Sequence, residues 1–321
     1  MAKHDSFPTV TPVSAVLLDA RRVSGGGSPY VQLDLAAEGQ RVAAISFDSD
    51  EEWLDRLSGP LTSQVFDLMA LPGQKRDAVV GIGDDHLYPA LWHLPADLCP
   101  VEGVLPAVQA LIHDVQAAPL KTFLLDVFAR RDMHRLFWTA PASIRHHHAY
   151  PGGLAVHSME VATDIAQHVG LSDIERDLGI TAGLLHDVGK VWAYTPDMQL
   201  TTAARAMGHE LLGLSRLEPY LRDLERHWPD GAWAMRVLLS GQCRMRADGS
   251  LPHSLVQRLR ACDQRSAEIA NRPTASASVL YGRRGRVRRR PTLRCAERLN
   301  GCEARRARSE PVSAAKGGGH R

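Results

Sequence analysis

Cysteine is scarce in this chain, and its five thiols are scattered over 321 residues with no CxxC pair. An odd number of widely spaced cysteines argues against a disulfide framework and a structural zinc site, so we expect reduced thiols. Long apolar runs are absent too, since no stretch approaches the ~20 apolar residues that a membrane-spanning helix needs. The first residues, MAKHDSFPTV, also lack the apolar stretch of a secretory signal. These absences predict a cytoplasmic protein with no membrane partner.

Charge is unevenly distributed along the chain, although the formal net charge is only +2. Residues 272–321 hold 14 Lys and Arg against 3 Asp and Glu, a net charge of +11. The rest holds 24 basic against 33 acidic residues, a net charge of −9. An acidic body repels a polyanion unless bound cations or a local basic groove intervene. The Arg-rich segment has the composition of a disordered tail, either a phosphate-binding arm or an end without a role.

The first 92 residues favour β-strands. The runs VSAVLLDARRV, PYVQLDLAA and QRVAAISF are apolar or alternating and are separated by the turn sequences GGGS and EGQ. A short helix, DEEWLDRL, and two further strands, SQVFDLMAL and RDAVVGI, follow. Three strands, a helix and two strands is the element order of an OB-fold barrel, which often holds single-stranded nucleic acid. Tyr30 and Phe47 are the aromatic residues best placed to stack on bases, although packing in the core or at an edge is the simpler interpretation.

Helical patterns replace the strands in the second part of the chain. Residues 93–130 begin with a Pro-rich segment, HLPADLCP, and we interpret them as a linker with leading helices. From Val101 the helical periodicity continues to a break at Asn271-Arg272-Pro273. We therefore expect about seven or eight helices in an all-α domain.

Histidines gather in the segment RHHHAYPGGLAVHSMEVA. Within it, His157 and Glu160 lie three residues apart on a predicted helix, so their side chains can face one cavity. Gly152 and Gly153 would let the preceding loop lie close to the helix start, with backbone N–H groups free to bind an anion.

A second motif, GLLHDVGK, carries an adjacent His186-Asp187 pair ahead of Gly189, which we expect to end the helix. Neighbouring helical residues point about 100° apart, so both side chains reach one ion only if other helices complete the site. The candidate ligands on other helices are His157, His209 and Asp263. Imidazole and carboxylate ligands without thiolate favour a six-coordinate ion over a closed zinc site, with Mn²⁺ first and Mg²⁺, Co²⁺ or Fe²⁺ as alternatives.

The spacing of these residues resembles the HD superfamily of metal-dependent phosphohydrolases, over roughly residues 120–271. More narrowly, PASIRHHHAYPGGLAVHS, GLLHDVGK and GHELLG resemble the YhaM-type 3′-5′ exoribonucleases, in which an OB-fold precedes the HD domain. The same strings, and RACDQRS in particular, are similar to the HD-containing TraI relaxase domain of conjugative elements. The resemblance implies an α+β, multidomain fold. Its parts would be an OB-like barrel at 1–92, the linker and leading helices at 93–130, an all-α HD domain at 131–271 and the disordered basic tail at 272–321.

The resemblance also implies a role for each matching residue. A first metal ion would be bound by His157, His186, Asp187 and Asp263, with His209 serving a second ion. Lys190 would bind a phosphate oxygen, and His147 or His148 would protonate the leaving oxygen. Tyr150, Gly152 and Gly153 would belong to the substrate-facing loop. His168, by contrast, is expected at the surface.

The chain departs from the family pattern at Ser240-Gly241-Gln242-Cys243, where the related exonucleases have a further pair of histidines. That departure removes a ligand from the second metal position. Both one ion and two ions are therefore consistent with the sequence.

Three functions follow from these patterns. The leading prediction is a phosphodiesterase, a 3′-5′ exonuclease on RNA or single-stranded DNA, in which a divalent-metal-activated water attacks phosphorus. The second is a small-nucleotide HD phosphohydrolase, which the acidic body favours because a small ligand needs no extended basic groove. The third is a TraI-like relaxase or DNA-processing protein of a conjugative element, in which the basic tail binds DNA.

Overall fold

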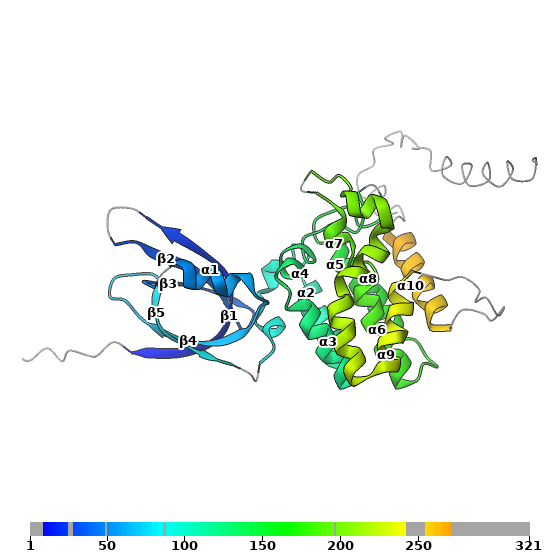
Figure 1. The fold of residues 1–321 in the computed structure, drawn as a ribbon, viewed down its shortest axis with the longest axis horizontal. Coiled ribbons are helices and arrows are strands. Elements are labelled where there is room, and N and C mark those ends of the chain that lie inside the picture. Colours follow the sequence, from blue (N-terminus) through cyan, green and yellow to red (C-terminus); the bar gives the residue numbers. More distant parts are fainter. Residues whose placement is uncertain are drawn as a thin grey trace, which may run out of the picture. The chain divides into compact units, whose positions relative to one another are not determined.

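Strands come first along the chain and helices follow (Figure 1). A computed structural model describes residues 9–24, 28–48, 50–85, 88–144, 146–195, 197–241 and 254–270, which all belong to one unit of the chain, Met1–Arg272. The predicted basic tail at 272–321, and the residues Gln242 and Cys243, lie outside these described residues.

The strands of the described chain form a closed barrel in the order β1-β2-β3-β5-β4. They are β1 (Val10–Val23), β2 (Tyr30–Ala37), β3 (Gln40–Ser46), β4 (Ser63–Met69) and β5 (Asp77–Asp84). Neighbours pair antiparallel except for β3 and β5, which are parallel. Helix α1 (Asp50–Ser58) lies between β3 and β4 in the sequence. The predicted order of three strands, a helix and two strands is confirmed.

Alternate residues of each strand fill the barrel interior. Val31, Leu33 and Leu35 of β2 are buried in one cluster with Phe66 of β4. The same cluster contains Trp53 of α1, so this helix contributes to the barrel core. Because successive side chains point to opposite faces of a strand, the residues between the buried ones lie on the outer surface of the barrel.

The rest of the described chain is mostly helical, as predicted. Its α-helices are α2 (Val104–Asp114), α3 (Ala118–Phe128), α4 (Arg131–Leu136), α5 (Gly153–Ala166), α6 (Asp173–Leu185), α7 (Lys190–Ala193), α8 (Thr202–His227), α9 (Pro229–Leu239) and α10 (Ser254–Ala270). Two short 3₁₀ helices follow the barrel: η1 (Ala90–His93) ends at the first residue of the Pro-rich segment, and η2 (Ala96–Leu98) lies within that segment. Among the described residues, no helix combines the length and the apolar character needed to cross a membrane.

The barrel and the helices share one apolar core. Val16 of β1 is completely buried in the cluster that also contains the core side chains of the helices. Arg131, at the start of α4, donates hydrogen bonds to the carbonyl oxygens of Leu17 (3.0 Å), Arg56 (2.9 Å) and Gly59 (2.9 Å). A single guanidinium thus satisfies three backbone acceptors of the barrel part.

Helices α5 and α6 pack closely because a glycine lies between them. A Cβ atom on Gly183 of α6 would lie 2.8 Å from Cα of Ala162 on α5, closer than real side chains approach. The start of α6 is fixed by a capping box, in which the side chains of Ser172 and Glu175 each accept from the other's backbone N–H. This packing places the C-terminal end of α6 beside the middle of α5.

Candidate metal centre

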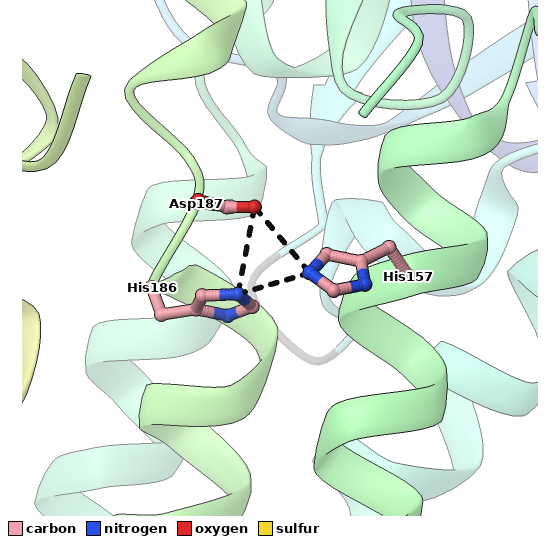
Figure 2. Close-up of side chains that lie close together, drawn as sticks. All are labelled: His157, His186 and Asp187. Atoms are coloured by element: carbon pink, nitrogen blue, oxygen red, sulfur yellow. Dashed lines mark hydrogen bonds and ion pairs between the residues drawn. The ribbon is translucent and has the colours of Figure 1, made fainter. Parts of the chain in front are cut away.

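Three ligand-type side chains meet where the end of α6 lies against α5 (Figure 2). His157 projects from α5, while His186 and Asp187 belong to the turn that follows α6 directly. Nε2 of His157 lies 3.2 Å from Nε2 of His186 and 3.4 Å from Oδ2 of Asp187. Nε2 of His186 lies 3.5 Å from the same carboxylate oxygen. One nitrogen of each ring and one carboxylate oxygen therefore point to a common position.

The other nitrogen of each imidazole is held by a hydrogen bond. Nδ1 of His186 donates to the carbonyl oxygen of Gly183 at 2.9 Å. Nδ1 of His157 lies 2.9 Å from Oγ of Ser266, and that hydroxyl donates its own proton to Glu160 at 2.6 Å. Ser266 therefore accepts from Nδ1–H of His157, which leaves Nε2 of both rings as the nitrogen that can bind a metal.

Asp263 of α10 adds a fourth ligand atom from a distant part of the chain. Its Oδ1 lies 3.1 Å from Nε2 of His157 and 3.8 Å from Nε2 of His186. The Asp263 side chain is 44% exposed, whereas His157 is fully buried. The fold thus brings together all four predicted ligands of the first ion.

These four atoms fit a divalent cation. With metal–ligand bonds of roughly 2.0–2.1 Å, neighbouring ligands around one ion lie roughly 3.0–3.5 Å apart. The separations of 3.1 to 3.8 Å between the paired atoms are close to that range. Two imidazoles and two carboxylates, with no thiolate, make a donor set suited to Mn²⁺, Fe²⁺, Co²⁺ or Mg²⁺.

The electrostatics of the centre also favour a cation. Burial opposes a charge on His157, but its hydrogen bonds to Asp187 and Asp263 outweigh burial and raise its pKa to about 9. Burial also opposes a charge on Asp187, yet electrostatic attraction to His186 and Lys190 holds the pKa of this carboxyl well below its usual value. The pKa of Asp263 is lowered as well, because hydrogen bonds from His157 and His186 outweigh its burial. Both carboxylates therefore keep their negative charge and attract a cation to this position.

Two further side chains, those of Lys190 and His209, contact the carboxylate of Asp187. The ammonium of Lys190 pairs with Oδ2 at 2.5 Å, and Nε2 of His209 lies 2.9 Å from Oδ1. Lys190 is buried, so its predicted contact with a phosphate oxygen would occur beside the ligand atoms and not at the surface. His209 contacts Oδ1 of Asp187, whereas His157 and His186 contact Oδ2. His209 could therefore bind a second ion that shares Asp187 with the first.

Gly189 has a different role from the one that the sequence predicted. It does not end α6, whose last helical residue is Leu185; it lies at the start of α7 instead. A Cβ atom on Gly189 would lie 1.8 Å from the carbonyl oxygen of His209 on α8. The glycine is therefore needed because the turn after Asp187 passes directly against the backbone of α8.

Of the two loop histidines with a predicted role, one borders the cavity and the other does not. His147 contributes to the cavity wall beside His157, with ring centroids 5.1 Å apart. Burial, together with the charges of His157 and Lys190, lowers the pKa of His147 to about 4, so this imidazole is uncharged at neutral pH. His148 is buried behind the ligands, where it contacts Glu160 at 3.2 Å and the hydroxyl of Tyr150 at 2.9 Å.

The prediction that Gly152 and Gly153 offer free N–H groups to an anion is wrong. The N–H of Gly152 donates to the carbonyl of Thr139 at 3.1 Å, and that of Gly153 donates to the carbonyl of Tyr150 at 2.9 Å. The glycines are required for steric reasons: Gly152 has a φ of +84°, and a Cβ atom on Gly153 would lie 2.0 Å from the carbonyl oxygen of His148. Of the predicted substrate-facing group, the Tyr150 side chain remains 42% exposed.

A cavity of about 280 Å³ lies beside the ligand cluster. His147, Lys190 and His209 contribute to its polar wall. The apolar part of its lining comes from Leu238, Leu239, Val256 and Leu259. Gly241 also lines it, so one residue of the segment Ser240-Gly241-Gln242-Cys243 borders this cavity.

Three residues of the site were not predicted from the sequence. Glu210 and Arg260 line the cavity, and Nδ1 of His209 lies 3.4 Å from the Glu210 carboxylate. Ser266 contacts His157 from a position 109 residues away in the chain. The adjacency of Glu210 to His209 in GHELLG was a usable signal, whereas no local pattern marks Ser266 or Arg260. His168 is exposed, as expected, and bonds the carbonyl oxygen of its neighbour Val169.

Comparison with known proteins identifies no family for this chain. No protein-family model matches it, and a search of curated proteins finds no match either. The function of the centre is therefore inferred from its own side chains.

Proposed function

We propose that this chain is a metal-dependent phosphodiesterase of the HD superfamily that trims RNA or single-stranded DNA from a 3′ end. The observation that carries the proposal is the convergence of four ligand atoms, from α5, from the turn after α6 and from α10, at the edge of a cavity. Imidazole and carboxylate ligands arranged around an open position are typical of metal-assisted hydrolysis.

The first ion would be held by His157, His186, Asp187 and Asp263, with Mn²⁺ as the leading candidate and Mg²⁺, Co²⁺ or Fe²⁺ as alternatives. A second ion would have Oδ1 of Asp187, His209 and Glu210 as its ligands, in place of the histidine pair that the chain lacks. When bound, a divalent cation supplies activation of a water molecule and compensation of charge on the phosphoryl oxygens.

The residues of the chain support hydrolysis in distinct ways. Lys190 places a positive charge at the cavity wall, where it stabilises a phosphoryl oxygen. Asp187 is held in orientation by its contacts with Lys190 and His209 on opposite oxygens. His147 is the loop histidine that borders the cavity, so we assign the proton transfer to it and not to His148. Because this imidazole is uncharged at neutral pH, it first accepts a proton from the attacking water and then passes that proton to the leaving oxygen. The apolar wall offers a surface on which a base can pack.

The barrel supports a nucleic-acid substrate. A closed five-stranded barrel with a helix between its third and fourth strands is the OB-like architecture expected from the sequence. Barrels of this kind hold single strands by stacking bases on aromatic side chains.

The test uses purified full-length protein with Mn²⁺ and an unstructured oligonucleotide labelled at its 5′ end. We expect release of mononucleotides. The double variant His186→Ala with Asp187→Ala removes two of the four ligands, so its rate should fall by more than about 100-fold, the upper range for losing an outer-shell partner of a metal ligand. His168→Ala, which removes an exposed histidine outside the centre, should leave the rate unchanged.

Activity that persists in the double variant would overturn the proposal. Elemental analysis of the same preparations counts the ions per chain, with one or two expected for the wild type and a loss in the double variant. Nicking of a single DNA sequence, without end-trimming, would point instead to the TraI-like DNA-processing function.

A second candidate function is hydrolysis of a small nucleotide. The cavity volume of about 280 Å³ favours it, because a pocket of this size suits one nucleotide unit better than an extended strand. Assay of a nucleotide panel against the oligonucleotide, at equal concentrations, separates the two candidates by their kcat/KM values.

A further inference from the structure

A second cavity, of about 520 Å³, lies on the barrel. We call it the barrel groove and define it by Tyr30, Ile45, Phe47, Leu71 and the segment 73–76. Its residues come from the adjacent ends of β2 and β3 and from the connection between β4 and β5 (Figure 1).

The aromatic residues of the barrel groove face outward and not into the core. In β2 and β3 the inward positions are taken by Val31 and Ala44, which are buried in the barrel cluster. Val31 pairs with Ser46 and both are buried, so the residues next beyond them, Tyr30 and Phe47, are directed away from the core, and both line the barrel groove. Phe47 is 63% exposed. Core packing, the simpler interpretation from the sequence, is therefore wrong for Phe47.

The same groove carries positive charge. Lys75 and Arg76 follow a turn in which the N–H of Gln74 donates to the carbonyl of Leu71 at 3.1 Å. Within the part of the chain that the structure describes, no carboxylate lies at ion-pair distance from either cation, whereas Arg41 of the same barrel pairs with Asp34 and Asp97. The charge of Lys75 and Arg76 is thus left for an external partner.

This combination identifies the partner by its chemistry. The exposed ring of Phe47 costs free energy in water. This ring and the half-buried ring of Tyr30 can stack on flat π systems, and adjacent cations bind phosphates. A strand of unpaired nucleotides offers both groups at once, in alternation along one chain. A duplex hides the faces of its bases, so it has only phosphates to offer.

We propose that the barrel groove binds single-stranded nucleic acid, with Tyr30 and Phe47 stacking on bases and Lys75 and Arg76 contacting phosphates. The inference deepens the proposed function, on which its choice of RNA or single-stranded DNA rests, by naming where the strand is held. The groove belongs to the barrel and shares no residue with the metal centre.

The binding test uses the full chain, in EDTA so that no cleavage occurs, and the fluorescence anisotropy of a labelled, unstructured 12-nucleotide strand. RNA and DNA versions of the strand show which sugar is preferred. Tyr30→Ala and Phe47→Ala should each weaken binding by about 5- to 150-fold, the range for losing one stacked base. The pair Lys75→Ala with Arg76→Ala should make the salt dependence of log K less steep by roughly 0.7 for each phosphate that is no longer bound. Trp233→Ala, which removes an exposed aromatic side chain from α9, is the matched control and should bind as the wild type does.

An abasic strand of equal length separates the groove from the Arg-rich segment at 272–321, because an abasic strand keeps its phosphates and lacks stacking partners. We expect the wild type to bind the abasic strand and a duplex more weakly than the base-bearing strand. Equal affinity for the abasic strand, wild-type affinity in Tyr30→Ala and Phe47→Ala, or no binding by the wild type would each overturn the proposal.

Failure of the proposed function gives a different result. If the wild type with Mn²⁺ hydrolyses neither the oligonucleotide nor the simple diester bis(p-nitrophenyl) phosphate, the hydrolytic proposal fails. The anisotropy measurements, made in EDTA, still decide the role of the barrel groove.

Discussion

One hydroxyl group decides which nitrogen His157 presents to the metal centre. Ser266 donates to Glu160 and accepts from Nδ1–H of His157, so the ring is held by a carboxylate acting through a serine. His148 contacts the same Glu160 carboxylate at 3.2 Å, which places a second imidazole behind the ligand. Outer contacts of this kind fix the tautomer and the basicity of a metal ligand.

Replacement of Ser266 tests this at the scale of a single residue. Ser266→Ala removes the acceptor for Nδ1–H of His157, so Mn²⁺ affinity should fall by about 10- to 100-fold. Ser266→Thr keeps the hydroxyl and should retain most of the affinity, while Ser254→Ala, at an exposed position on the same helix, should be neutral. Equilibrium dialysis with Mn²⁺ measures all three. Unchanged affinity in Ser266→Ala would show that His157 is oriented by other groups.

At the scale of elements, the site depends on how closely helices approach. Gly183 lets α5 and α6 come together, and Gly189 lets the turn after Asp187 lie against α8. The two contacts align ligands that short sequence patterns place on separate helices. A histidine and an aspartate next to each other in sequence become a site only because the backbones on either side are close.

Gly189→Ala should disturb that arrangement. The new Cβ atom would lie 1.8 Å from the carbonyl oxygen of His209, a backbone atom, so α8 has to move away from the turn. Overpacking of this kind costs about 1–3 kcal/mol, and the free energy of unfolding in urea should fall by that amount, with weaker Mn²⁺ binding. Gly59→Ala is the matched control, because nothing lies within 4 Å of its added Cβ atom. Equal stability of the two variants would contradict the tight packing of α8 on the turn.

For the whole molecule, the link between the barrel and the helices rests on Arg131 as well as on the shared apolar core. Arg131→Ala leaves the carbonyls of Leu17, Arg56 and Gly59 without this donor. We expect a loss of about 2–3 kcal/mol and separate unfolding transitions for the strands and the helices.

Circular dichroism and tryptophan fluorescence in urea measure these transitions. The control is Arg135→Ala on the same helix, whose ion pair with Asp19 is exposed and spans 3.7 Å, so it should cost less than about 1 kcal/mol. A single transition in Arg131→Ala, with the stability of the control, would show that the apolar core alone holds the two parts together.

The strands of the barrel and the His186-Asp187 pair could be predicted because local sequence patterns mark them. The alternation of Val31, Leu33 and Leu35 marks a strand with one buried face, and the adjacent His186-Asp187 pair marks chemistry because packing does not explain it. Each pattern spans only a few residues, so it can be recognised without knowledge of the fold.

What the sequence could not predict depends on partners far along the chain. The N–H groups of Gly152 and Gly153 are occupied by carbonyls, which no spacing rule reveals. Ser266 contacts His157 across 109 positions of the chain, and Tyr30 and Phe47 line one groove only because of the register of two strands. Gly189 resembles a helix stop, but its real constraint is the backbone of α8. Each of these is a tertiary contact between two segments, and neither segment carries a local sequence pattern that predicts the contact.

The position of Asp263 has a consequence for the order in which the candidate metal centre is assembled. Three of the four ligands lie between residues 157 and 187, while the fourth comes from α10, the last helix that the structure describes. A chain emerging from the ribosome makes its barrel, and then three ligands, well before it makes Asp263. Under the proposed function, the metal centre would therefore close late in synthesis, after the barrel has had time to fold, and a nascent chain would have an incomplete metal site while its own messenger RNA is still close by.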